Sequence, residues 1–358
     1  MKKCLSALLV LVMAFALALP LLAQATKPLK AAFVYIGPPG DLGYTYEHDR
    51  GRKAAEAALG SKVKLDFIEN VPEGPDAERV IRQYAQDGYD MIFATSFGYM
   101  DPTLNVAQEF PKVKFEHCSG YKTAPNMATY FGKIEQARYL TGIVAGKMTT
   151  SNKIGYVAAF PIPECVRGVN WFTLGVRSVN PKAEVRVVWT NTWYDPVKER
   201  EAAVALLDAG CDVMAQHQDT TEPQKAAAER GKLSIGYDSD MGKFVGDSVL
   251  TSAIWNWGAY YTMTLKDALA GTWKSHAYWG GMKDGVVDIA PLSKKVPKAV
   301  ADLVAKAKAD ILSGKLNIYA GPIADQSGKV RIAKGASIGD EEQLNMDWFV
   351  QGVVGKVK

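Results

Sequence analysis

Aromatic rings, carboxylates and amides recur in this chain just past the ends of its predicted strands. In the first half they are Asp41, Tyr44, Phe97, Tyr99 and Glu135, and in the second half Trp193, Asp195, Gln216 to Asp219, Asp238 and Asp240. Each alone is more typical of packing or helix capping than of ligand contact. Because the carboxyl ends of parallel strands meet at one edge of a sheet, we expect these side chains to converge on one rim. Flat rings beside carboxylates and amides suit a planar heterocycle with N–H donors, since stacking contributes about 1–3 kcal/mol per base face and edge hydrogen bonds select the ring.

The chain lacks the sequence patterns of metal and covalent catalysis. Its four histidines, His48, His117, His217 and His276, stand singly, without a partner at metal-ligand spacing. There is no G-x-S-x-G or H-E-x-x-H pattern. We therefore expect a binding protein without enzyme activity, metal or cofactor.

A glycine-rich turn at 37–43 lies between a predicted strand and a predicted helix. It is not G-x-G-x-x-G and has no Walker lysine, and Pro38 and Pro39 remove two N–H donors from any phosphate cradle. The pattern favours a tight turn over a phosphate site. The helix N-terminus behind it can still offer N–H groups to a polar ligand.

Short apolar strands alternate with amphipathic helices, which predicts parallel α/β construction. The expected strands of the first half are 30–36, 63–68, 91–94, 113–115 and 127–131, and a helix at 135–148 closes that half. The pattern then restarts with strands at 153–159, 185–189, 213–216 and 233–237, and a further strand at 249–254 precedes a helix to about Ala270. We expect two doubly wound, Rossmann-like lobes around a ligand cleft, joined by several chain crossings. The first lobe would hold 26–149 plus 250–280, and the second 150–249 plus 281–358.

The first 25 residues read as a cleavable signal peptide. Lys2 and Lys3 precede an apolar run, and Ala23-Gln24-Ala25 is a signal-peptidase site, so the mature protein should begin near Thr26 in the periplasm. Cleavage lowers the net charge from +4 to +2, which argues against a nucleic-acid partner. Three cysteines remain, Cys118, Cys165 and Cys211, and we expect buried free thiols with at most one bridge.

Several segments resemble the basic membrane protein (BMP) family of ABC-transporter substrate-binding proteins, which includes the purine-nucleoside receptor A-like proteins. The resemblance covers nearly the whole mature chain. The matching segments are Gly40 to Thr45 (the family's D-x-S-F-N loop), Phe131 with Glu135 and Gly142, Asp195-Pro196 with Lys198 (F-x-D-P), Ile235 to Asp240 (I-G-V-D-x-D), Leu250 to Ser252, Gly321 to Ile323 and Met346 to Val350. The resemblance implies the type I periplasmic binding protein fold and a monomer that delivers a purine base or nucleoside to an ABC permease.

The family pattern also implies roles for individual residues. Tyr44 would stack on the ligand, Asp41 would accept hydrogen bonds from the base edge, and Asp238 would reach ribose hydroxyls in nucleoside binders. Trp193 stands at the family's usual Phe, so it could stack on the opposite face. The full set of expected ligand-binding residues is Asp41, Tyr44, Thr45, Phe97, Glu135, Trp193, Gln216 and Asp238.

Three departures from the family pattern bear on the ligand. Thr45 replaces the usual Asn, Gly43 replaces the usual Ser, and Gln216 to Asp219 replace a glycine-rich turn. The bulkier side chains at 216–219 could fill the space of a sugar. We therefore expect a free purine base such as adenine in preference to a nucleoside.

Other functions remain open at this point. Within the binding class the ligand could be another heterocycle, such as a flavin, or another small solute. An exported nucleosidase-type hydrolase would need a paired acid and base at the cleft. A cytosolic ligand-sensing regulator could share the lobes, but the signal peptide and the lack of a DNA-binding headpiece argue against it.

Overall fold

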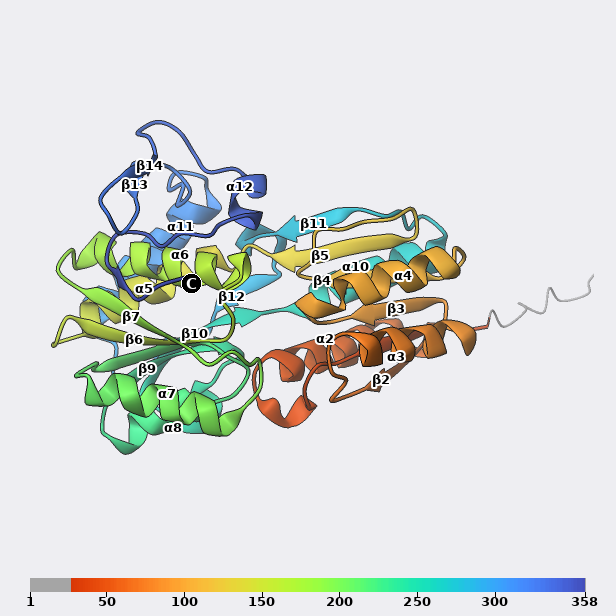
Figure 1. Cartoon of the computed structure of the whole chain (residues 1–358), viewed down its shortest axis with the longest axis horizontal. Helices are drawn as coiled ribbons and strands as arrows, with labels where there is room; N and C mark the ends of the chain where they lie inside the picture. The colour runs from red at the N-terminus through yellow and green to blue at the C-terminus, as the bar shows by residue number, and fades with distance from the viewer. Residues whose placement is uncertain (1–26, 358) are drawn as a thin grey trace, which may run out of the picture.

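Two sheets of mainly parallel strands lie end to end in the computed structural model, which describes residues 27–357 (Figure 1). The predicted signal peptide lies outside the described residues. The first sheet is entirely parallel, in the order β11-β5-β4-β3-β1-β2. Its strands are β1 (Leu29–Val34), β2 (Val63–Ile68), β3 (Met91–Ala94), β4 (Lys114–Cys118), β5 (Met127–Gly132) and β11 (Ala277–Gly280). The first lobe's helices are α2 (Tyr44–Leu59), α3 (Pro75–Gln86), α4 (Met100–Glu109) and α10 (Trp257–Ala270), with short 3-10 turns at Pro39–Asp41, Gly60–Lys62 and Phe97–Tyr99.

The second sheet has the order β12-β10-β9-β8-β6-β7-β15, and only β12 runs antiparallel to its neighbour. Its strands are β6 (Lys153–Ala158), β7 (Glu184–Trp189), β8 (Val213–His217), β9 (Leu233–Asp238), β10 (Val249–Trp255), β12 (Val287–Ile289) and β15 (Val353–Val354). Its helices are α5 (Glu135–Met148), α6 (Pro163–Val179), α7 (Pro196–Asp208), α8 (Glu222–Glu229), α9 (Gly242–Val245), α11 (Lys298–Leu312) and α12 (Asp340–Leu344), with a 3-10 turn at Met282–Asp284. A small hairpin, β13 (Ile323–Ala324) and β14 (Val330–Ile332), lies at the outer edge of this lobe (Figure 1). The predicted α/β class with two doubly wound lobes is confirmed.

Two of the three predicted lobe boundaries differ from those in the structure. The expected break at 149/150 moves to the end of β5, because α5 packs on α6 and the second sheet instead of closing the first lobe. A Cβ on Gly142 would lie 2.2 Å from the carbonyl oxygen of Phe172, so α5 and α6 touch backbone to backbone. The periodicity of α5 shows that one face is buried but does not say against which sheet.

The second boundary moves for a similar reason. The strand expected to start the return to the first lobe, β10, pairs with β9 and stays in the second sheet. The chain crosses only after Trp255, whose indole stacks on Trp257 at the start of α10 with ring centroids 4.6 Å apart. It crosses back between β11 and β12, as the sequence predicts. Three connecting segments of the chain therefore join the lobes.

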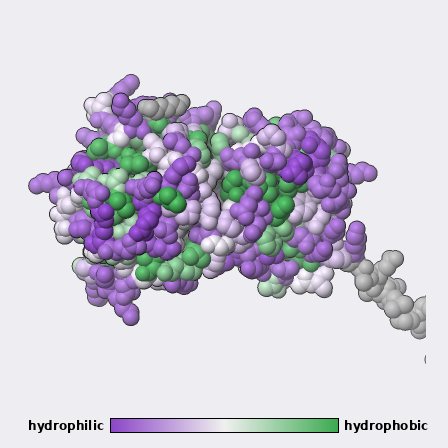
Figure 2. Space-filling view, turned by 60° about the horizontal axis from the view of Figure 1, so that its bottom comes forward, coloured by the Kyte–Doolittle hydropathy of each residue, from purple (hydrophilic) through white to green (hydrophobic). Residues whose placement is uncertain are grey.

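Polar side chains cover most of the face seen in Figure 2, where the two lobes form separate masses joined at a narrower waist. Among residues 27–357, no helix combines the length and apolar character needed to cross a membrane.

Candidate functional site

A cavity lies between the lobes, where the carboxyl ends of both sheets face each other. Each lobe contributes five lining residues. The first lobe supplies Ile36, Tyr44, Ser96, Phe97 and Ser119, and the second supplies Glu164, Trp193, His217, Asp219 and Tyr237. Except for Tyr237, within β9, and His217, the last residue of β8, they lie on segments that follow strands. The strand-end rim expected from the sequence is therefore where the cavity forms.

The first lobe presents two aromatic rings to the cavity, and the one hydroxyl among them points into the lobe. Tyr44 is the first residue of α2, and its hydroxyl donates to Cys118 Sγ at 3.4 Å, inside the lobe. Its ring also meets the His48 ring edge to face, with centroids 4.4 Å apart. Phe97 begins the 3-10 turn after β3 and is partly exposed to the cavity. These two rings can offer a ligand flat contact and little hydrogen bonding.

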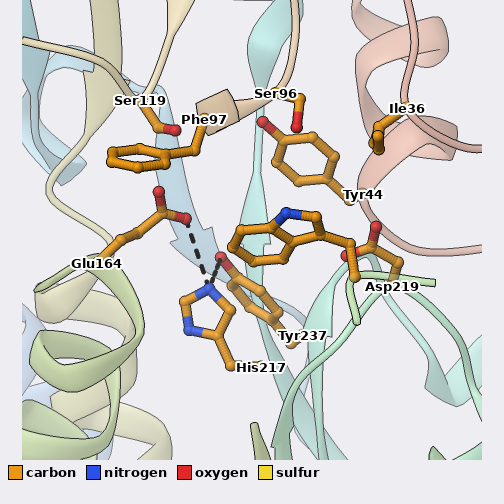
Figure 3. A pocket seen from close by; sticks show the side chains of 10 residues that line it. Ile36, Tyr44, Ser96, Phe97, Ser119, Glu164, His217, Asp219 and Tyr237 are labelled. Carbon is orange, nitrogen blue, oxygen red and sulfur yellow. Dashed lines mark hydrogen bonds and ion pairs between the residues drawn. The ribbon is translucent and has the colours of Figure 1, made fainter. Parts of the chain in front are cut away.

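The second lobe presents ionisable groups. Glu164, in the first turn of α6, approaches His217, with 3.5 Å between Oε1 and Nε2, and the Tyr237 hydroxyl lies 3.4 Å from the same nitrogen (Figure 3). Burial lowers the pKa of His217 to about 4, although the neighbouring Glu164 acts in the opposite direction, so the imidazole is neutral at pH 7. The Arg138 guanidinium covers the outer face of the Tyr237 ring at 3.6 Å from its centroid.

Two carboxyl oxygens at the cavity have no hydrogen-bond partner within the described chain. They are Glu164 Oε2 and Asp219 Oδ2, and both side chains are over nine-tenths buried. Glu164 and Asp219 lie on opposite sides of the cavity in Figure 3. Burial, followed by repulsion from Asp238 and Asp41, raises the pKa of Asp219 well above its usual range. Since an unpaired buried polar atom costs about 1–3 kcal/mol, a ligand with N–H or O–H donors at both ends would stabilise this arrangement.

Of the eight ligand-binding residues expected from the sequence, the structure brings Tyr44, Phe97 and Trp193 to the cavity. Trp193 packs edge-on against Phe160, with centroids 5.2 Å apart. Its main-chain oxygen accepts from the Asp219 N–H at 3.3 Å.

Asp41 does not line the cavity, so its expected role at the base edge needs correction. Its carboxylate accepts from the main-chain N–H groups of Gly43, Thr45 and Tyr46 at 2.8–2.9 Å. Asp41 therefore caps α2 and positions Tyr44. The Asp41 side chain points to these N–H groups because the first turn of a helix leaves its N–H donors without main-chain partners.

The other four expected residues also lie outside the lining. Thr45 is buried beneath Gly37, and Glu135 pairs with Arg167 at 2.7 Å. Gln216 donates to the carbonyl oxygens of Gln218 and Thr220, which fixes the turn after β8. Asp238 accepts from Trp255 Nε1 at 2.8 Å, and its main chain adopts a left-handed φ of 66°. These side chains hold the strand-end turns in shape.

Sequence reasoning missed Glu164, and it placed His217 and Asp219 on the strand-end rim without selecting either as a ligand-binding residue. Glu164 follows strand β6 and the Pro161-Ile162-Pro163 turn, so the strand-end rule that singled out Asp41 applied to it equally. Tyr237 carried no such signal, because it lies inside a predicted strand.

Two further expectations concern sulfur and metals. Cys118, Cys165 and Cys211 are buried and unpaired, which confirms the prediction of free thiols. Within residues 27–357 no group of three or more His, Cys, Asp and Glu side chains is placed to hold a metal ion.

Comparison with known proteins identifies the family. Residues 29–321 match the family of PnrA-like ABC transporter substrate-binding proteins. A purine-binding protein from Brucella abortus is 48% identical over 94% of this chain and 95% of its own length. A putative ABC transporter glucose-binding protein from Haloferax volcanii is 42% identical over 92% of this chain and 82% of its own length. A solute-binding protein of an ABC transporter system from Conexibacter woesei superposes with a TM-score of 0.66 at 25% identity, over 81% of this chain and 98% of its own. Proteins of this family bind substrates and are not enzymes. The chain belongs to the PnrA-like (BMP) family of ABC transporter substrate-binding proteins, as its sequence motifs predict.

Proposed function

We propose that this protein is a periplasmic, monomeric substrate-binding protein that closes its lobes over a purine and delivers it to a membrane permease driven by a separate ATPase. The signal peptide at 1–25 supports export, and the family supports the transporter. Closure requires no chemistry, only a higher affinity of the ligand for the closed state than for the open one.

The observation that carries the proposal is the chemistry of the cavity. Aromatic rings from both lobes line a space whose two unpaired carboxyl oxygens, on Glu164 and Asp219, lie on opposite sides. A purine offers flat faces for the rings and N–H donors for the carboxyl groups. The 48% identical relative from Brucella abortus is named for purine binding, which supports the same ligand class.

We further propose that a free base such as adenine binds in preference to a nucleoside. Free adenine carries N–H donors at both ends, on its amino group and on the imidazole nitrogen that bears the sugar in adenosine. Glycosylation removes this N–H, and the ribose would then have to fit beside the carboxyl group that the N–H contacts in the free base.

Two of the four side chains expected to limit the space do line the cavity, and the other two do not. Gln216 and Gln218 bond within their own lobe, the latter to the Thr190 hydroxyl. His217 and Asp219, from the same turn, line the cavity. These two residues would occupy the volume of a ribose.

A sugar is the second candidate, because the relative from Haloferax volcanii is named for glucose binding. Aromatic faces and carboxylates also suit sugar rings. Mass spectrometry of the small molecules released when freshly purified protein is denatured distinguishes the two. We expect a purine at near one equivalent; a hexose, or a flavin, would contradict the proposal.

A further inference from the structure

The two lobes meet main chain to main chain at Gly43 and Asp219. A Cβ built on Gly43 would lie 2.2 Å from the carbonyl oxygen of Asp219 and 2.8 Å from its carbonyl carbon. Ordinary van der Waals contact begins at 3.4 Å, so even a methyl group would require the lobes to retreat by about 1 Å at this point. Only glycine permits an approach as close as the one in this structure.

Neighbouring contacts lie at the same edge of the cleft. The Ser239 hydroxyl donates to the carbonyl oxygen of Leu42, directly before Gly43. The rings of Tyr46 and Phe244 meet edge to face with centroids 5.6 Å apart. Residues 42–46 of the first lobe thus form one continuous docking edge against the second lobe.

This contact joins the segments that hold Tyr44 and Trp193, two of the four Phe, Tyr and Trp side chains that line the cavity. Gly43 directly precedes Tyr44. Asp219 donates its N–H to the main-chain oxygen of Trp193, while its carboxyl group lines the cavity. The separation between Gly43 and Asp219 therefore fixes the separation between the Tyr44 ring on one side and Trp193 and Asp219 on the other.

We propose that the Gly43–Asp219 contact is the stop that ends lobe closure, and that it sets the width of the slot between Tyr44 and Trp193 to that of one flat ring. Gly43 is then a positioning residue for binding, although it lies outside the cavity lining. The width of the slot, but not the existence of the stop, rests on the purine function proposed above.

The test replaces Gly43 and a matched glycine in the same loop. Gly43→Ala should keep the 1:1 stoichiometry and the association rate for adenine, because encounter occurs with the open form, while dissociation becomes about tenfold faster or more. Gly40→Ala is the control, since a Cβ there meets nothing within 4 Å and should leave both rates unchanged. Small-angle scattering with adenine should show the compact form for the parent and Gly40→Ala, and a more extended form for Gly43→Ala. Unliganded melting temperatures check that all three proteins fold.

A second measurement needs no ligand. A disulfide between Leu42→Cys and Ser239→Cys can form only when the docking edge closes, and adding Gly43→Ala should slow its formation severalfold, whereas adding Gly40→Ala should not. The stop would be overturned if Gly43→Ala left the rate of disulfide formation unchanged, or if its adenine affinity stayed within threefold of the parent. It would also be overturned if Gly40→Ala lost as much adenine affinity as Gly43→Ala. If the double-cysteine protein forms the disulfide and Gly43→Ala slows it as expected, but the parent protein binds no purine, the proposed function is overturned and the stop remains.

Discussion

Two buried carboxyl groups, one in each lobe, show how the same side-chain chemistry can be structural in one place and available to a ligand in another. Glu116 in β4 and Asp219 after β8 are 0% and 4% exposed. Glu116 accepts from Tyr260, Thr264 and Trp273 at 2.6–2.7 Å, and these partners tie α10 and the segment after it to the first lobe. Asp219 Oδ2 accepts from no group of the described chain. Burial is common to both acids, and the two differ in whether the described chain supplies hydrogen-bond partners.

The same contrast extends to the two walls of the cavity. The first lobe offers the rings of Tyr44 and Phe97 together with two serines, whereas the second places the carboxyl groups of Glu164 and Asp219 at the cavity. We infer that the first lobe supplies shape and the second supplies selectivity. The following substitutions test that division, from the largest expected effect to the smallest.

Glu116→Gln should lower the free energy of unfolding by about 3 kcal/mol, because its amide N–H₂ would face groups that need an acceptor and leave donors unpaired. Adenine affinity of the folded fraction should stay within threefold of the parent. Urea unfolding and calorimetry measure the two quantities. A stable variant with weak binding would mean that Glu116 acts on the ligand.

Asp219→Asn should behave in the opposite way. Replacing the carboxyl oxygen that accepts from the ligand with an amide N–H₂ should weaken adenine binding by about 1–3 kcal/mol, roughly fivefold to 150-fold, while stability is unchanged or rises because the buried group of acids loses one ionisable member. Asp240→Asn, a partly exposed acid paired with Lys243 in the same region, is the matched control. Binding at parental strength would remove Asp219 from the site.

Trp193→Ala and Tyr44→Ala should each weaken binding by about 1–3 kcal/mol through lost stacking, without unfolding the lobes. Isothermal calorimetry with adenine measures the loss, and circular dichroism checks the fold. If neither variant weakened binding, the two rings would not enclose the ligand.

Glu199 provides a test of a different kind, a slope of stability with pH. Burial raises its pKa from 4.5 to about 8, although Thr220 and the Asp195 N–H donate to it. The folded protein therefore takes up a proton that the unfolded chain releases, so this contribution is greatest below pH 4.5, declines as pH rises towards 8 and is flat above. Unfolding at several pH values between 5 and 9 should show a shallower decline in Glu199→Gln than in the parent. Identical slopes would contradict the assignment.

The sequence predicts that strand ends form the edge of the cavity better than it predicts which side chains point into the cavity. Alternating strands and helices establish two doubly wound lobes, and the strand-end rule correctly brings Tyr44, Phe97 and Trp193 to the cavity. Local hydrogen bonds decide where a side chain points after the turn, and the hydrophobic periodicity of the sequence does not reveal those bonds. Asp41 bends back onto the N-terminus of α2, whereas Asp219 has no such partner and faces the cavity.

Lobe assignment was limited by a related problem. The apolar face of α5 could cover either sheet, and the close backbone packing at Gly142 and Gly175 placed it on the second. Closely spaced glycines on one helix face are the feature that could have indicated a tightly packed helix pair, though not its lobe.

A side-by-side calorimetric titration of adenine, hypoxanthine, adenosine, guanosine and glucose tests the central claim most directly. The account predicts that adenine binds at 1:1 stoichiometry and at least tenfold, or about 1.4 kcal/mol, more tightly than adenosine, with no binding of glucose. Adenosine binding tenfold more tightly than adenine would contradict the free-base assignment. Glucose binding in the absence of any purine binding would contradict the purine function itself.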